Sequence, residues 1–137
     1  MNASKQMNSK PLIAIVDDDS SVRESTQLLL RSAGYRAEVF ASAREFLDSA
    51  RHSETVCLIL DVRMPGMDGL ELQRRLNEAE RQIPIIFITA QATESEEQRA
   101  RKGGAVDFLR KPVNDEKLLS AIQTALKGKG NNERTRL

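Results

Sequence analysis

The sequence of 137 residues has no tryptophan, a single cysteine, few aromatic side chains and no long apolar run. The lone cysteine, Cys57, excludes an intramolecular disulfide framework, and its apolar neighbours predict a small buried hydrophobe. The N-terminus MNASKQMNSK lacks an apolar stretch of signal-peptide length, and no run approaches the ~18 apolar residues of a membrane-spanning helix. We therefore expect a cytoplasmic protein with no membrane association.

Net charge is also almost absent. The chain has 21 lysines and arginines against 20 aspartates and glutamates, which gives a net charge of +1 at pH 7. A domain that binds nucleic acid through its net charge would carry a clear excess of basic residues. We therefore expect no direct DNA binding by this chain, whose length fits one globular domain with its own core.

The sequence does contain a regular alternation of short apolar runs and amphipathic stretches. The runs typical of buried strands cover residues 11–16, 36–40, 55–61, 84–89 and 105–109. The helical patterns cover residues 20–33, 42–50, 68–79, 93–102 and 114–127. This alternation predicts an α/β fold with a parallel five-stranded sheet and helices on both faces. The predicted organisation is a flexible leader (1–10), the domain (11–127) and a charged tail or the start of a linker (128–137).

Polar side chains stand where the predicted strands end. Asp17, Asp18 and Asp19 follow the first apolar run, and Asp61 ends the third. The fourth run ends at Thr89, and the fifth leads to Lys111. Because the carboxyl ends of parallel strands lie at one edge of an open sheet, where ligands bind, we expect these side chains to form one site.

Carboxylates gathered at one edge repel one another. Two unit charges ~4 Å apart repel by ~4 kcal/mol at an effective dielectric constant of ~20. A hard divalent cation offsets this repulsion, and Mg²⁺ prefers carboxylates together with water and phosphate oxygens, so it would bridge an acidic pair after the first run and Asp61. The Thr89 hydroxyl and the Lys111 ammonium favour a phosphoryl group in the same site. Asp61 is the predicted nucleophile, because carboxylates form acyl phosphates.

The motifs VDDD, LILDVRMPGMDG, FITA and FLRKP, in this order, resemble the receiver domain of bacterial two-component response regulators. The resemblance covers residues 11–127. The stretches DVRMPGMDG and GAVDFLRKP, with the spacing from Thr89 to Phe108, are most similar to FixJ-like receivers. The resemblance implies a flavodoxin-like, doubly wound (βα)5 fold with strand order 2-1-3-4-5.

Matched residue by residue, the resemblance assigns roles to the acidic residues. It implies that Asp61 is the phosphoacceptor and that Asp17 and Asp18 hold Mg²⁺, for which Mn²⁺ substitutes. Asp18 would bind the metal more directly and Asp17 mainly through water. The backbone carbonyl of Arg63 would complete the protein's share of the metal ligands.

The resemblance also assigns switch positions. It implies that the Thr89 hydroxyl moves towards the phosphoryl group while Phe108 turns inward, although Phe108 also fits a plain core aromatic. The bond before Pro112 corresponds to one that is usually cis in the family. Arg63 and Gln91 border the phosphoryl group and are expected to tune dephosphorylation, in a direction that the sequence leaves open.

The partners implied by the resemblance are a sensor histidine kinase as phosphodonor and an output domain or downstream protein as the reader of the switch. Such a domain is not an enzyme beyond catalysing its own phosphorylation and dephosphorylation. A phosphorylation-dependent homodimer is a further expectation, weakened by the very polar helix predicted over residues 93–102. Because most such proteins continue into a DNA-binding domain, a chain ending in NNERTRL is expected to be a stand-alone receiver or to stop within a linker.

Two other functions fit the sequence less well. A haloacid-dehalogenase-like phosphatase also begins with a strand followed by Asp-x-Asp, here Asp17 and Asp19. That family favours threonine or valine where this chain has Ser21, and it leaves Asp61 unexplained. For Asp19 we therefore expect a solvated or helix-capping residue. A purely structural interaction module leaves the whole acidic cluster without a purpose.

Overall fold

The computed structural model describes residues 10–135, so the leader predicted for residues 1–10 lies almost wholly outside the described residues. Within that range, strands and helices alternate along the chain. In order they are β1 (Leu12–Val16), α2 (Ser20–Ser32), β2 (Arg36–Phe40), α3 (Ala43–Asp48), the short 3-10 helix η1 (Ala50–Glu54), β3 (Thr55–Asp61), α4 (Gly69–Glu78), β4 (Ile85–Thr89), α5 (Glu94–Lys102), β5 (Asp107–Arg110) and α6 (Asp115–Thr135).

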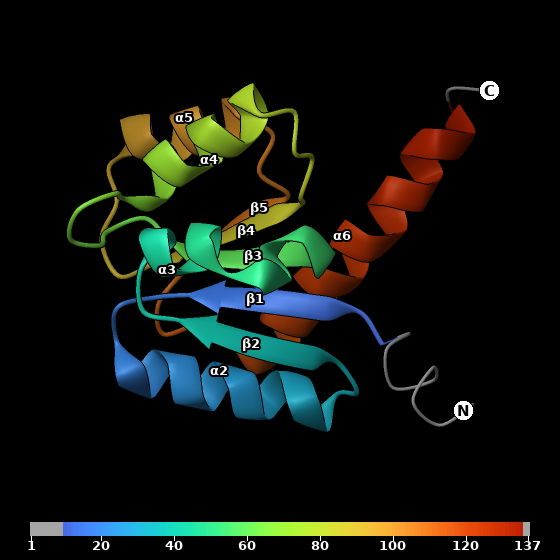
Figure 1. The fold of residues 1–137 in the computed structure, drawn as a ribbon, viewed down its shortest axis with the longest axis horizontal. Helices are drawn as coiled ribbons and strands as arrows, with labels where there is room; N and C mark the ends of the chain where they lie inside the picture. The colour runs from blue at the N-terminus through green and yellow to red at the C-terminus, as the bar shows by residue number, and fades with distance from the viewer. Residues whose placement is uncertain (1–9, 136–137) are drawn as a thin grey trace.

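The strands form one parallel sheet in the order β2-β1-β3-β4-β5, as predicted. Helices α3, α4 and α5 cover one face, and α2 and α6 cover the other (Figure 1). Strand order reverses between β1 and β3, because the chain leaves β1 towards β2 and later returns past it to β3. In open α/β sheets the crevice beyond the strand ends at this point is where ligands bind.

Side-chain alternation along the central strands builds two cores. Every residue of β1 is buried, and every residue of β3 except Val56. On the face of α3, α4 and α5 the two strands contribute Ala14, Val16, Leu58 and Leu60. On the face of α2 and α6 they contribute Ile13, Ile15, Cys57 and Ile59. Burial on both faces explains why these strands are continuous apolar runs in the sequence.

Helices α2 and α4 both begin at an aspartate cap. The Asp19 carboxylate accepts hydrogen bonds from the N–H groups of Ser21 and Val22, which confirms Asp19 as the N-cap of α2. Asp68 caps α4 in the same way, accepting from the N–H of Glu71. The two caps lie just beyond the ends of β1 and β3, so they fix where the chain turns away from the sheet edge.

The end of the last helix differs from the prediction. The sequence predicts that it ends at Lys127, whereas α6 continues to Thr135 (Figure 1). Gly128 lowers helix propensity by only ~1 kcal/mol, and no proline follows it to stop the helix. The fifth strand is also shifted, to Asp107–Arg110. No helix in residues 10–135 combines the length and apolar character needed to cross a bilayer.

Candidate functional site

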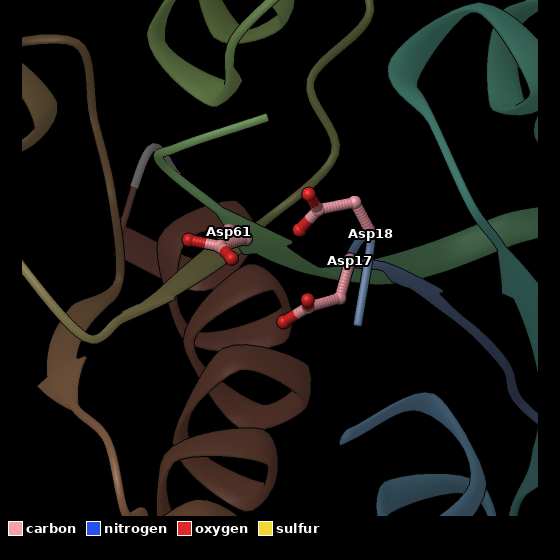
Figure 2. Close-up of side chains that lie close together, drawn as sticks. All are labelled: Asp17, Asp18 and Asp61. Atoms are coloured by element: carbon pink, nitrogen blue, oxygen red, sulfur yellow. The ribbon is translucent and has the colours of Figure 1, made fainter. Parts of the chain in front are cut away.

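The topology brings the predicted acidic residues together at the carboxyl edge of the sheet. Asp17 and Asp18 follow β1, and Asp61 is the last residue of the neighbouring strand β3. Each offers a carboxylate oxygen, and these three oxygens lie within 4.8 Å of one another. Figure 2 shows the three side chains turned towards a common space. Asp17 and Asp61 are buried and Asp18 is exposed, so one side of the cluster is open to solvent.

Lys111, just beyond β5, is the cation of the site. Its Nζ donates a hydrogen bond to Asp61 Oδ2 at 2.9 Å and lies 2.8 Å from Asp17 Oδ2. The contact with Asp17 is an ion pair, and this fully buried oxygen has no other polar partner among the described residues. The other oxygen, Asp17 Oδ1, accepts from the N–H of Asp19.

Burial dominates the titration of the central carboxylate. Desolvation raises the pKa of Asp61 above its usual value, the hydrogen bond from Lys111 opposes that rise, and the negative charge of Asp17 adds to it. For Lys111, burial alone would lower the pKa, but Asp17 and Asp61 together raise it. Lys111 therefore stays protonated and is the one lysine that holds two carboxylates in this site.

The donor set fits a divalent cation. All three candidate ligands are carboxylate oxygens, the type that hard cations prefer, and they belong to the same small space. A buried oxygen without a hydrogen bond, Asp17 Oδ2, also leaves lone-pair capacity unused. The acidic cluster thus has the chemistry and the openness to bind a metal ion.

Thr89 is placed beside the site but not turned to Asp61. It is fully buried at the end of β4, and its Oγ1 donates to the backbone carbonyl of Gln91 at 2.8 Å. Phe108 is buried in the core, with its ring centroid 5.9 Å from that of Phe87. Its burial agrees with a core aromatic, and its switch role stays a prediction.

Arg63 reaches away from the acidic cluster. Its backbone N–H donates to Asp61 Oδ1 at 3.1 Å, whereas its guanidinium extends to Glu96 of α5. The predicted metal-binding role of its backbone carbonyl is not tested by these contacts. The bond between Lys111 and Pro112 is cis, as the resemblance implies. Cys57 is fully buried, and this burial raises the pKa of its thiol to about 12, so the thiol is inert near neutral pH.

Sequence reasoning missed one residue that shapes the site. Gly69, the first residue of α4, packs so tightly behind β3 that an added Cβ would lie 2.2 Å from the backbone oxygen of Asp61. In the sequence it is part of the turn-like stretch RMPGMDG, which indicates a turn but not a close approach. A glycine that directly follows a helix N-cap was the available signal.

Comparison with known proteins identifies the family of this fold. Residues 13–123 match the family described as response regulator receiver domain. The chain belongs to this family. Receiver domains are the phospho-accepting switches of two-component response regulators, and their partners are histidine kinases and output domains.

Particular relatives support the assignment. The receiver is 50% identical to the response regulator protein TodT of Pseudomonas putida over 116 residues, which are 85% of this chain and 51% of TodT. It is 39% identical to the transcriptional regulatory protein FixJ of Bradyrhizobium diazoefficiens over 121 residues, 88% of this chain and 59% of FixJ. The solved structure of response regulator StyR matches with a TM-score of 0.83 and 45% identity, covering 93% of this receiver and 65% of that chain. The receiver thus spans about half the length of the curated relatives it matches.

Proposed function

We propose that Asp61 is the phosphoacceptor of this receiver, with Asp17 and Asp18 holding Mg²⁺ beside it. The observation that carries this proposal is the convergence of three carboxylates at the end of a central strand, with Lys111 Nζ 2.9 Å from Asp61. Of the three, Asp61 alone lies within a strand, at its end, where it accepts hydrogen bonds from Lys111 Nζ and from the N–H of Arg63. Asp17 is tied to the turn after β1 and is fully buried, which suits a ligand better than a nucleophile.

The chemistry is the transfer of a phosphoryl group to a carboxylate. An Asp61 oxygen attacks the donor's phosphorus, the bond from phosphorus to the donor's leaving atom breaks, and a mixed carboxylic-phosphoric anhydride forms. Mg²⁺ bound by the acidic residues would supply positive charge to the phosphoryl oxygens and lessen the repulsion between anions. Lys111 contributes a second positive charge, and the N–H of Arg63 holds the attacking carboxylate in place.

The conformational signal would start at Thr89. Its hydroxyl now donates to the Gln91 carbonyl, so reaching a phosphoryl oxygen on Asp61 requires the exchange of one acceptor for the other. Phe108 lies on the neighbouring strand, next to Phe87, and would adjust its packing as β4 and its following loop move. Phosphorylation would thereby shift a pre-existing equilibrium between two arrangements.

The wider role follows from this chemistry. We infer that a sensor histidine kinase is the donor, that the reaction takes place in the cytoplasm where ATP charges such kinases, and that the domain catalyses only its own phosphorylation and dephosphorylation. An output domain or a separate protein would read the switch, with transcriptional control one form of output. We also propose that phosphorylation promotes dimerisation. We expect no direct DNA binding by this domain.

Incubation with acetyl phosphate and Mg²⁺ tests the assignment by intact-protein mass spectrometry. Asp61→Asn should abolish the mass gain of one phosphoryl group, because its amide is a poor nucleophile. Asp19→Asn is the matched control, since asparagine caps a helix as well as aspartate does and Asp19 lies outside the acidic cluster. Full labelling of Asp61→Asn would refute the role of Asp61.

The same labelling experiment distinguishes the receiver from the phosphatase alternative. In that reading Asp17 and Asp19 act together, but the Asp19 carboxylate is engaged in capping α2. Multiple turnovers of a phosphate ester that depend on Asp17 would support a phosphatase. A single stoichiometric label that depends on Asp61 supports the receiver.

A further inference from the structure

The loop of residues 90–93, between β4 and α5, has little apolar anchorage. Ala90, Gln91 and Thr93 are exposed, and Ala92 is only partly packed against the core. Helix α5 offers little more, because Ala100 is the one residue that it buries. The position of this loop must therefore depend on polar contacts.

Arg63 provides the first of these contacts. Its Nη2 lies 2.8 Å from Glu96 Oε1, and its Nε donates to the backbone carbonyl of Gln91 at 3.4 Å. Glu96 Oε1 also accepts from the N–H of Thr93, within the capping box that starts α5. One guanidinium thus links the chain just after Asp61 to the loop and to the first turn of α5.

The Gln91 carbonyl is shared with Thr89. It accepts from Arg63 Nε and, at 2.8 Å, from Thr89 Oγ1. Because Thr89 is fully buried, its hydroxyl is held on whichever acceptor the protein presents. The placement of one exposed backbone carbonyl therefore decides whether the hydroxyl faces Gln91 or the phosphoryl site.

A second arginine holds the next carbonyl of the same loop. Arg110 Nη1 donates to the carbonyl of Ala92 at 3.4 Å, and its Nη2 lies 3.3 Å from Glu97 Oε1. Arg110 directly precedes Lys111. Two arginines, one two residues after Asp61 and one directly before Lys111, thus tie the loop to two successive glutamates of α5.

We propose that Arg63 and Glu96 form a clamp that holds the Gln91 carbonyl under the Thr89 hydroxyl and so opposes the phosphorylated arrangement. Arg63 is a positioning residue for Thr89, acting through Gln91. The proposal rests on the assignment of Asp61 as phosphoacceptor and gives a direction to the effect of Arg63 and Gln91. Opening the clamp removes a contact made only before phosphorylation, and the equilibrium shifts towards the phosphorylated arrangement.

The variants Arg63→Gln, Glu96→Gln and their double test the clamp. Glu96→Gln removes the charge but preserves the capping box, since glutamine also serves at this position. Glu78→Gln is the matched control: it removes an acidic partner from an exposed ion pair with Arg74 on α4, outside the loop. Titration with acetyl phosphate at fixed Mg²⁺ gives the concentration that half-saturates phosphorylation, and methyl NMR of unphosphorylated protein reports the rotamer of Thr89.

Both single variants should lower the half-saturating concentration about two- to fivefold, the range expected for one partly exposed ion pair. The double variant should lower it no further, because either change alone opens the clamp. The Thr89 methyl signal should shift in the same direction in all three, with Glu78→Gln unchanged in both measurements. The two single variants change net charge in opposite directions, so a shared direction identifies the pair and not the overall field.

Other results overturn the clamp. A higher half-saturating concentration in Arg63→Gln would show that Arg63 binds the phosphoryl group directly. Additive effects, or a Glu96→Gln variant that behaves as the wild type, would show that the ion pair does not hold Thr89. If Asp61→Asn is still phosphorylated, the assignment of the phosphoacceptor fails; if Asp61→Asn is not phosphorylated and the clamp variants match the wild type, only the clamp fails.

Discussion

Replacing Gly69 with alanine tests how closely α4 must approach β3, the strand that ends at the proposed phosphoacceptor Asp61. Gly69 opens α4, and its N–H donates to the Val62 carbonyl at 3.0 Å. A Cβ at this position would lie 2.2 Å from the backbone oxygen of Asp61 and 3.2 Å from Leu60 Cγ. In the first contact the backbone fixes the positions of both the Cβ and the oxygen, so no side-chain rotation relieves it.

The expected loss of stability follows from the size of the overlap between the added Cβ and the Asp61 oxygen. An unstrained contact begins near 3.4 Å, so the start of α4 and the end of β3 must separate by about 1 Å. Such overpacking costs ~1–3 kcal/mol, and the helix propensity of alanine returns up to ~1 kcal/mol, which leaves a net loss of stability of up to ~3 kcal/mol. Moving a reacting group by ~1 Å lowers rates by about a hundredfold, so phosphorylation of Asp61 should be affected more than stability.

Urea unfolding measures the stability of Gly69→Ala, and the initial rate of labelling by acetyl phosphate measures its function. Gly128→Ala is the control, because a Cβ there meets nothing within 4 Å and lies in α6, away from the acidic site. The control should label at the wild-type rate and be equally or slightly more stable. A Gly69→Ala protein with wild-type stability and labelling rate would refute the close approach.

Two further predictions concern the charges of the site. Lys111→Met should destabilise the fold by ~3 kcal/mol at pH 7, because Asp17 and Asp61 lose their cation, and by less at pH 5 in a thermal-unfolding series. The sign follows from Asp61: with a raised pKa in the fold, its protonated form favours folding below the usual pKa of 3.8, and that gain is lost as pH rises through the raised value. A destabilisation independent of pH would contradict this account. Asp18→Ala should weaken Mg²⁺ binding by more than about tenfold in calorimetry yet raise the Tm without metal, since Asp18 is a third carboxylate within 4.8 Å of two others; a sharply lower Tm would contradict the repulsion.

Much of the fold could be predicted from the sequence, because strands that are buried on both faces of a sheet have continuous apolar sequences. β1 and β3 are continuous apolar runs, and each predicted strand is present, with β5 displaced by a residue or two. The members of the site could be predicted for a related reason. Once strands are parallel, Asp17, Asp61, Thr89 and Lys111 must come to the same edge whatever the details of packing.

Contacts that depend on tertiary distance could not be predicted. Gly69 resembles any turn glycine until α4 is seen against the backbone of β3. The orientation of the Thr89 hydroxyl depends on a carbonyl two residues away, and Arg63 reaches a glutamate 33 positions later in the chain. The end of α6 was missed because a glycine close to a helix end is compatible both with a cap and with a continued helix.

These contacts divide the site into a rigid side and a movable side. Asp61 is held by β3, by the close packing of Gly69 and by the hydrogen bond from Lys111, so a phosphoryl group cannot displace it without disturbing the core. The loop of residues 90–93 is held by arginine contacts at the surface, each worth little on its own. A newly attached phosphoryl dianion can outcompete contacts of that strength but not apolar packing, which makes regions held by few buried contacts the ones that move. Phosphorylation should therefore move β4, this loop and α5, while β1 and β3 stay in place.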